Sequence, residues 1–289
     1  MRCERPFCPQ CLREASVGYQ CVECIGAAPW TGPRPFPGAA PPGQGGSGPG
    51  QGGSGQGSAP VRRPRSARTV AGASLASPTL MVPLLISLNT AVFLWTVVQS
   101  GSVASNASAT LFQEWTLQPQ YVASGQWWRL FTAGFLHFGP IHLVFNMVAL
   151  WVIGKELEPV LGRIRFLALY LVGLLGGSAA PFLFGPPDTQ VAGASGAVFG
   201  LMGGLAVVLR RMRLSASPAL TLIGLNLVLS FVVPNISILG HLGGLVAGAV
   251  ATAALVYAPA RDRNRWQAAG IGAIVVTLLL IMELRAVLL

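Results

Sequence analysis

Charge is scarce in this sequence. Only 10% of its 289 residues are Asp, Glu, Lys or Arg, whereas soluble domains carry about 25%. Hydrophobic residues make up 52% of the chain, and the mean hydropathy is +0.60. This composition excludes an ordinary soluble domain. We therefore expect an all-α integral membrane protein whose helices lie in the lipid bilayer.

Acidic residues are rarer than basic ones. The chain has 9 Asp and Glu against 19 Lys and Arg, which gives a net charge of +10. In a soluble protein this balance would suggest a nucleic-acid partner. Here the cations flank apolar segments, where they set the orientation of membrane helices. We expect no nucleic-acid partner, and the polar, cysteine-rich N-terminus does not resemble a signal peptide.

Cysteine is absent after residue 24. Two CxxC pairs stand before that point, and four thiolates complete a tetrahedral zinc site. We predict that residues 1–28 form a zinc-binding module, since so short a segment needs a metal to fold. The alternatives are a disordered thiol-rich tail or disulfides, which a reducing compartment disfavours. The predicted ligands are Cys8, Cys11, Cys21 and Cys24, and Cys3 is either a spare thiol or part of a second metal site.

Residues 29–78 connect this module to the apolar part of the chain. Up to residue 60 they are mostly Gly, Pro, Ser and Gln, a composition typical of a flexible linker without a core. A basic run follows, which we interpret as a juxtamembrane anchor rather than a site for a specific partner. Its members are Arg62, Arg63, Arg65 and Arg68.

From residue 79 the chain alternates apolar runs with short polar segments. Each run is close to the roughly 20 residues that a helix needs to cross a bilayer. We predict a six-helix core over residues 79–257 and an extra transmembrane helix in residues 258–289. The expected spans cover about 79–99, 132–153, 166–184, 193–209, 217–234, 237–257 and 267–286.

The distribution of cations predicts the orientation. If the N-terminus is cytosolic, every loop agrees with the positive-inside rule, and the opposite side holds only Arg129 and Arg285. We therefore expect a multi-pass plasma-membrane protein. Glu158 stands beside Arg163 and Arg165 at the cytosolic end of the second span, so we also expect it to form an ion pair with one of them. The cytosolic cations would be Lys155, Arg163, Arg165, Arg210, Arg211, Arg213, Arg261, Arg263 and Arg265.

Two stripes of glycine predict a close contact between two of the spans. Glycines recur at every fourth position after Ser195, and a matching stripe surrounds His241. Such spacing makes one helix face bare, so a second backbone can approach it closely. Ser195 and His241 would both lie in the outer third of the bilayer. The stripes are Gly196, Gly200 and Gly204, and Gly240, Gly244 and Gly248.

Polar side chains in the second span complete a candidate site. His142 and Asn146 are four residues apart and share a helix face, with His137 nearer the outside. No Asp or Glu lies inside the neighbouring spans, so a Ser-His dyad is possible and a Ser-His-Asp triad is not. His241 would activate Ser195 for attack on a carbonyl, and His142 and Asn146 would stabilise the oxyanion. We expect no catalytic metal, because this is a poor ligand set.

These motifs resemble the rhomboid family of intramembrane serine proteases. The resemblance rests on four motifs in the same order along the chain and covers about residues 79–257. It implies a six-helix core, Ser195 as nucleophile, His241 as base, and a transmembrane segment of another protein as substrate, cleaved near its outer end. The motifs are Trp128-Arg129, His137-x4-His142-x3-Asn146, Gly193-Ala-Ser195-Gly196 and Gly240-His241-x2-Gly244-x3-Gly248.

The resemblance extends to both ends of the chain. The last span is similar to an extra C-terminal helix in some rhomboids. The cysteine module is similar to zinc-binding segments that precede the membrane domain of some bacterial rhomboids. Those segments often carry a further metal-binding pair upstream. Met1 stands just before Cys3, so the true start and the metal count stay open. Phe199 stands one turn after Ser195, where some members have a tyrosine, and we expect it to stack on His241.

Three alternatives stay open. The first is an inactive rhomboid-like protein that binds or escorts membrane clients, although both dyad residues are present. The second is a channel or transporter with a histidine relay, which the apolar inner halves of the spans disfavour. In the third, Ser195 is only a small packing residue, which leaves the matching depth of His241 unexplained.

Several other residues receive structural interpretations. Trp128 is expected to anchor at the membrane interface, and Arg129 to hold the first loop to lipid headgroups or to backbone carbonyls. Asn226 and Ser230 would either line the path of the substrate or bond to neighbouring helices. Asn106 begins a short glycosylation sequon.

Overall fold

The computed structural model describes residues 12–14, 19–21, 68–73, 79–232 and 236–288. The chain divides into two units, Met1–Arg62 and Arg63–Leu289. In the first unit, β1 (Leu12–Glu14) and β2 (Tyr19–Cys21) pair antiparallel, with Leu12 opposite Cys21. The predicted ligands Cys8, Cys11 and Cys24 lie outside the described residues, as do Cys3 and most of the predicted linker.

The second unit is a helical membrane domain, as the composition predicts. Among the described residues, one long helix overlaps each predicted span, and five of these seven helices are long and apolar enough to cross a membrane. The other two, α8 and α9, have 17 and 16 residues. The seven helices are α2 (Met81–Ser100), α6 (Gly139–Leu161), α7 (Arg163–Phe184), α8 (Ser195–Arg211), α9 (Ser217–Val232), α10 (Ile238–Val256) and α11 (Arg263–Leu288).

The second span starts later than its apolar pattern predicts. The expected segment began near residue 132, but α6 begins at Gly139 and continues to Leu161. Pro140 fits the first turn of a helix, because the backbone N–H that it lacks would have no partner there. Gly139 and Gly162 both adopt positive φ, at 75° and 80°, and so mark the two ends of the helix. As a result His137 lies before the helix rather than inside it.

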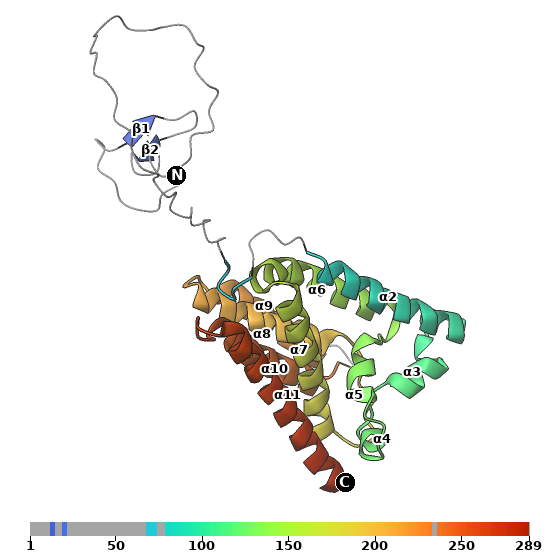
Figure 1. Cartoon of the computed structure of the whole chain (residues 1–289). Helices are drawn as coiled ribbons and strands as arrows, with labels where there is room; N and C mark the ends of the chain where they lie inside the picture. Colours follow the sequence, from blue (N-terminus) through green and yellow to red (C-terminus); the bar gives the residue numbers. More distant parts are fainter. Residues whose placement is uncertain (1–11, 15–18, 22–67, 74–78, 233–235, 289) are drawn as a thin grey trace, which may run out of the picture. The chain divides into compact units, whose positions relative to one another are not determined.

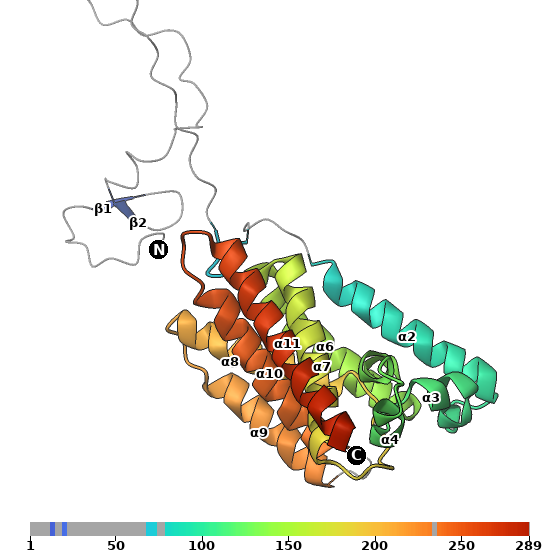
Figure 2. The same ribbon diagram turned by 60° about the horizontal axis from the view of Figure 1, so that its bottom comes forward.

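A long connection between α2 and α6 folds over one flank of the bundle. Figure 1 shows the first of its short helices beside α2, and Figure 2 shows α9 on the flank opposite α2. A cluster of buried apolar side chains joins this connection to α7 and α11, with Leu117, Leu130, Phe182 and Met282 among its members. The short elements are η2 (Asn106–Ser108), α3 (Thr110–Trp115), α4 (Pro119–Ala123), α5 (Arg129–Thr132) and η3 (Ala133–Phe135).

Glycines bring three helices, α7, α8 and α10, into backbone contact. A Cβ atom added at Gly200 would lie 2.8 Å from the Cα of Gly173 and 3.2 Å from the carbonyl oxygen of Gly244. A Cβ at Gly177 would lie 2.7 Å from the Cα of Gly196. Lipid provides little hydrophobic drive for helix association, so such close backbone packing is a main source of stability. The predicted contact of α8 with α10 is therefore present, and α7 joins it.

Glu158 has a different role from the ion pair expected of it. Its carboxylate accepts hydrogen bonds from the backbone N–H groups of Leu80, Met81 and Val82, at 2.7, 2.9 and 3.0 Å. These donors belong to the start of α2, where the helix dipole favours a negative charge. Arg165 donates instead to Gln267 and to Asn264 of α11, at 2.7 and 2.8 Å. A buried carboxylate thus caps α2.

Part of the segment predicted to be linker packs on the membrane domain. Residues 68–73 form a turn in which the Thr69 amide donates to the Ala73 carbonyl at 2.9 Å. Ala71 is fully buried, and its carbonyl accepts a hydrogen bond of 3.0 Å from the side chain of Gln267. The juxtamembrane chain is therefore fixed against the start of α11.

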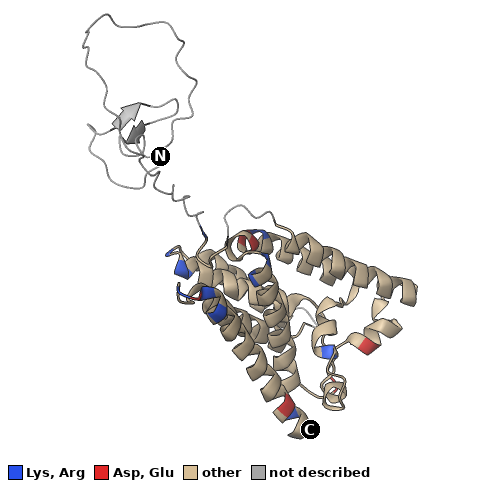
Figure 3. Cartoon of the chain, in the orientation of Figure 1, with Lys and Arg blue, Asp and Glu red and all other residues tan. Residues whose placement is uncertain are grey.

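Basic residues gather at one end of the bundle (Figure 3). At this end α8 and α10 finish and α7 and α11 begin, so the cations of four helix termini come together. Ser195 starts α8 and therefore lies at the other end. The described cations of the basic end include Arg163, Arg165, Arg210, Arg211, Arg261, Arg263 and Arg265.

Replacing Gly248 by alanine tests the close packing. The new Cβ would overlap the Cα and carbonyl of Gly200 in the facing helix. We expect the free energy of unfolding to fall by about 1–3 kcal/mol, seen as a lower thermal midpoint in detergent. Gly272→Ala is the matched control, because its Cβ meets nothing within 4 Å. Equal midpoints for the two variants would contradict the packing argument.

Candidate active site

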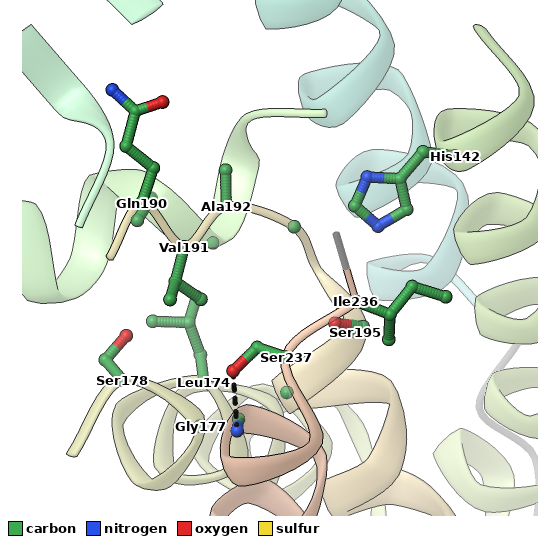
Figure 4. A pocket seen from close by; sticks show the side chains of 15 residues that line it. His142, Leu174, Gly177, Ser178, Gln190, Val191, Ala192, Ser195, Ile236 and Ser237 are labelled. Carbon is green, nitrogen blue, oxygen red and sulfur yellow. Dashed lines mark hydrogen bonds between the residues drawn. The ribbon is translucent and has the colours of Figure 1, made fainter. Parts of the chain in front are cut away.

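Ser195 is the first residue of α8 and lies on the wall of a pocket (Figure 4). The pocket has a volume of about 30 Å³, room for about one or two water molecules. The amide groups at a helix start have no acceptor within the helix and carry the positive end of its dipole. The surroundings of Ser195 therefore favour a developing negative charge. His142, Ser178, Gln190, Gly193, Gly196 and Ser237 are among the other lining residues.

Gly193 is required at its position for two reasons. Its φ of 134° is a conformation that other residues rarely adopt. A Cβ there would lie 2.7 Å from Cε1 of His142, 3.0 Å from its Nε2 and 3.6 Å from the Oγ of Ser195. The missing side chain thus leaves the space in which His142 and Ser195 come near each other. The sequence motif that contains both Gly193 and Ser195 has a direct steric explanation.

Hydrogen bonding assigns a donor role to His142. The backbone N–H of Phe138 donates to its Nδ1 at 3.3 Å, so Nδ1 carries a lone pair and the proton of a neutral ring is on Nε2. That nitrogen is the one beside Gly193. His142 can therefore donate a hydrogen bond toward the region next to Ser195.

Asn146 lies one turn further along α6 and is 6% exposed. Its amide donates to the carbonyl of His142 at 2.9 Å, which leaves a second N–H on the same nitrogen. Asn146 does not line the pocket. The sequence placed Asn146 and His142 on one face, and the backbone bond between them is consistent with that placement.

His241 is held by contacts from two other helices. Its ring stacks on Phe199 of α8, with centroids 4.1 Å apart and an interplanar angle of 16°, as the sequence predicts. Its Nδ1 lies 2.6 Å from the Oγ of Ser230 in α9. Ser230 therefore bonds to a neighbouring helix, one of the two roles predicted for it.

The structure brings the helices of Ser195 and His241 together without joining the two side chains. A Cβ at Gly244 would overlap the carbonyl of Gly196, and these residues stand three after His241 and one after Ser195. Among the described residues, however, the Oγ of Ser195 makes no hydrogen bond, and His241 is not part of the pocket wall. Catalytic hydrogen bonds are often long in enzymes without substrate.

His137 and Asn106 organise the approach to α6. The His137 ring is fully buried and packs edge-on against His142, with centroids 5.2 Å apart. The Asn106 amide donates to the His137 carbonyl at 2.9 Å and to Thr96 Oγ1 at 3.0 Å, and its oxygen accepts from Gly139 N at 3.0 Å. With 1% exposure, Asn106 is a structural residue rather than an accessible glycosylation site.

Arg129 fastens the long connection through backbone carbonyls, one of its two expected roles. It donates to the carbonyls of Gln113 and Thr116, both at 2.7 Å, and to the side chain of Gln126 at 2.7 Å. Burial lowers the pKa of its guanidinium, against the opposing influence of Tyr121 and Glu114.

The segment that Arg129 holds is continuous with the candidate site. Leu117, next to Thr116, pairs with Val191 through two backbone bonds of 3.0 and 2.9 Å. Gly193 N then donates to Ala133 O at 2.9 Å. Trp128 is half exposed and donates to Glu114 O at 3.2 Å.

Sequence reasoning missed the third helix of the packing core. Gly173, Gly176 and Gly177 of α7 contact α8 and α10, and Ser178 of the same helix lines the pocket. The signal was present, because three glycines within five residues also make a bare helix face. Among the described residues, no group of three or more His, Cys, Asp or Glu side chains could hold a metal ion.

Comparisons with known proteins show which family this domain resembles. Residues 124–258 match the model of the rhomboid domain. The chain is 40% identical over 177 residues to the rhomboid protease GluP of Bacillus subtilis, covering 60% of this chain and 34% of GluP. The chain belongs to the rhomboid family. The matched range contains every residue predicted for the candidate site.

Two further relatives show how far this similarity extends. YdcA, a rhomboid relative in Bacillus subtilis, is 39% identical over 132 residues, which cover 44% of this chain and 66% of YdcA. RHOMBOID-like protein 4 of Arabidopsis thaliana is 36% identical over 133 residues, which cover 44% of this chain and 34% of the relative. The chain thus spans from about a third to just under two thirds of the length of these relatives.

Replacing Asn106 by alanine tests its structural role. Its three partners, two of them buried, would each lose a hydrogen bond, so we expect the free energy of unfolding to fall by about 1–3 kcal/mol. Ser108→Ala is the control, because it removes the same sequon while its hydroxyl makes only an exposed bond to Ser105 O. Thermal unfolding in detergent distinguishes the two variants. If Ser108→Ala destabilises as much as Asn106→Ala, the network is not what holds this turn.

Proposed function

We propose that this rhomboid is an intramembrane serine endopeptidase that cleaves transmembrane segments of other membrane proteins. Ser195 is the nucleophile and His241 the general base. The contact between α8 and α10 carries the proposal, since Gly196 and Gly244 meet next to the two residues. The name of the relative GluP, a rhomboid protease, supports the same activity.

The reaction proceeds through an acyl-enzyme. His241 takes the proton of the Ser195 hydroxyl while Oγ bonds to the carbonyl carbon of the scissile peptide. The C–N bond then breaks, and the imidazolium returns the proton to the leaving amine. Water attacks the ester in the second half, losing a proton to His241, which passes it to the Ser195 oxygen. The net reaction is hydrolysis of one peptide bond, with the enzyme regenerated.

The oxyanion is stabilised by donors from α6 and from the start of α8. The proton on Nε2 of His142 points to the space beside Gly193, and the start of α8 supplies backbone N–H groups. Asn146 contributes its second amide hydrogen. Removal of one such donor typically lowers the rate about 10²–10³-fold. The small pocket beside Ser195 has room for the water that the second step needs.

The orientation follows from the charged end of the bundle. We place this basic end (Figure 3) at the cytosolic face of the plasma membrane, because the positive-inside rule puts Lys and Arg on that side. Ser195 begins α8 at the other end, and His241 is the fourth residue of α10, about 5 Å along the helix axis. The site therefore opens to the extracytoplasmic side, where substrates are cut near their outer ends.

The first test is cleavage of a model transmembrane substrate by the purified protein in detergent. We expect the wild type to cut, and Ser195→Ala and His241→Ala to lose activity while both variants remain folded. His142→Ala is a graded comparison, expected to bind substrate and to cut about 10²–10³-fold more slowly.

Each outcome of this test decides between the hypotheses. Cleavage that survives Ser195→Ala would show that the nucleophile is wrong. If the wild type and both variants bind the segment and none of them cuts it, the inactive, client-binding alternative is favoured. A fluorophosphonate probe gives a second measurement, because it labels an activated serine and would lose its target in Ser195→Ala.

For the N-terminal unit we propose a single zinc ion bound by four thiolates. The β-hairpin supports this proposal, since β1 starts one residue after Cys11 and its first residue pairs with Cys21. This pairing places Cys21 opposite the residue that follows Cys11 in the sequence. The catalytic reaction uses no metal.

Metal analysis of the full-length protein tests this site. We expect one zinc ion per chain, since four thiolates complete one tetrahedral site. Cys8→Ser should lose it and Cys3→Ser should retain it. A wild-type protein purified without chelators that contains no zinc would rule out the site, and two ions per chain would show that Cys3 belongs to a second one.

A further inference from the structure

Ser230 is a buried polar residue that takes no part in the proposed reaction steps. It lies on α9, is 4% exposed, and makes two short contacts. One is to the backbone carbonyl of Asn226 at 2.7 Å, and the other is to Nδ1 of His241 at 2.6 Å. We propose that Ser230 is a positioning residue that fixes the tautomer and direction of the catalytic base. This inference rests on the proposed role of His241.

The two contacts define where the protons are. A serine hydroxyl has one hydrogen and can accept through its lone pairs. Both contacts are hydrogen bonds only if Ser230 donates its hydrogen to the Asn226 carbonyl and accepts a hydrogen from Nδ1 of His241. In the opposite arrangement, Ser230 would donate its hydrogen to Nδ1 of His241. The Oγ of Ser230 and the carbonyl oxygen of Asn226 would then lie 2.7 Å apart without a hydrogen between them. Nδ1 therefore carries the proton, and Nε2 has a free lone pair.

A bare Nε2 is what a general base requires. It must accept the proton of Ser195, and a ring with its proton on Nε2 could not do so. In a serine triad a carboxylate imposes this tautomer through Nδ1. Here α7, α8, α9 and α10 contain no Asp or Glu. A carboxylate would be costly to bury at membrane depth, whereas a hydroxyl already satisfied by a backbone carbonyl carries no charge.

Two helices share the task of orienting the ring. Phe199 of α8 stacks against its face and fixes the plane, while Ser230 of α9 holds Nδ1 and fixes rotation within that plane. Nε2 is then directed away from α9. The readiness of the base therefore depends on α9 lying against α10. Asn226 is a part of the same arrangement through its carbonyl, and its side chain bonds separately to Leu222 O at 2.8 Å.

The test combines a spectroscopic measurement with kinetics. The chain has three histidines, so protein labelled with ¹⁵N only at histidine gives few imidazole signals, which single histidine replacements assign. We expect His241 of the wild type to carry its proton on Nδ1. In Ser230→Ala we expect a mixture of tautomers. Ser230→Thr keeps the hydroxyl and should restore the wild-type signal.

The kinetic arm uses the same variants. Loss of one hydrogen bond to the base should lower kcat between about threefold and tenfold in Ser230→Ala. KM should stay constant, because Ser230 touches no substrate, and Ser230→Thr should recover most of kcat. A merely structural role would change the thermal midpoint without changing the tautomer.

The outcomes separate this inference from the proposed function. The tautomer can be measured in the inactive Ser195→Ala background, so it does not depend on cleavage. A wild-type His241 with its proton on Nε2, or a tautomer that is identical in Ser230→Ala, would overturn the role of Ser230 even if the enzyme is active. A wild type that cuts nothing but shows the expected tautomer contradicts the proposed activity and leaves the Ser230–His241 bond supported.

Discussion

Backbone contact among α7, α8 and α10 is the constraint on which the rest of the structure depends. Glycine at Gly177, Gly196 and Gly244 removes the side chains that would separate the helices. Helices in lipid associate through such packing rather than through burial of apolar surface. The close approach also sets the geometry of the site, because Ser195 and His241 lie beside these glycines. Stability and the proposed chemistry therefore depend on the same interface.

The two histidines of the site have opposite hydrogen-bonding roles, and neutral groups assign both. A backbone N–H donates to Nδ1 of His142 and leaves the proton on Nε2, whereas a hydroxyl accepts from Nδ1 of His241 and leaves Nε2 bare. One ring can thus donate to an oxyanion while the other takes a proton. In a low-dielectric environment, dipoles achieve this without the cost of burying a charge.

Much of the membrane domain could be predicted from the sequence, because its signals are local. Apolar runs, the glycine stripes and the histidine spacing indicated seven helices, the contact of α8 with α10 and the residues near the pocket. Long-range polar contacts could not be read in this way. The Asn106 network and the Ser230–His241 bond depend on how helices are rotated against one another, which periodicity does not specify. The cap that Glu158 forms on α2 could not be predicted for the same reason, since its backbone partners lie 76 to 78 residues away in the sequence.

The cap on α2 also has a consequence for the order of assembly. Glu158 lies 76 to 78 residues after the amides that it binds. A growing chain therefore delivers α2 to the membrane well before the carboxylate that completes its first turn has been synthesised. Until α6 arrives, those N–H groups need water or lipid headgroups as partners. The start of α2 therefore reaches its final hydrogen bonding only after α6 has been inserted, so the folding of the two helices is coupled.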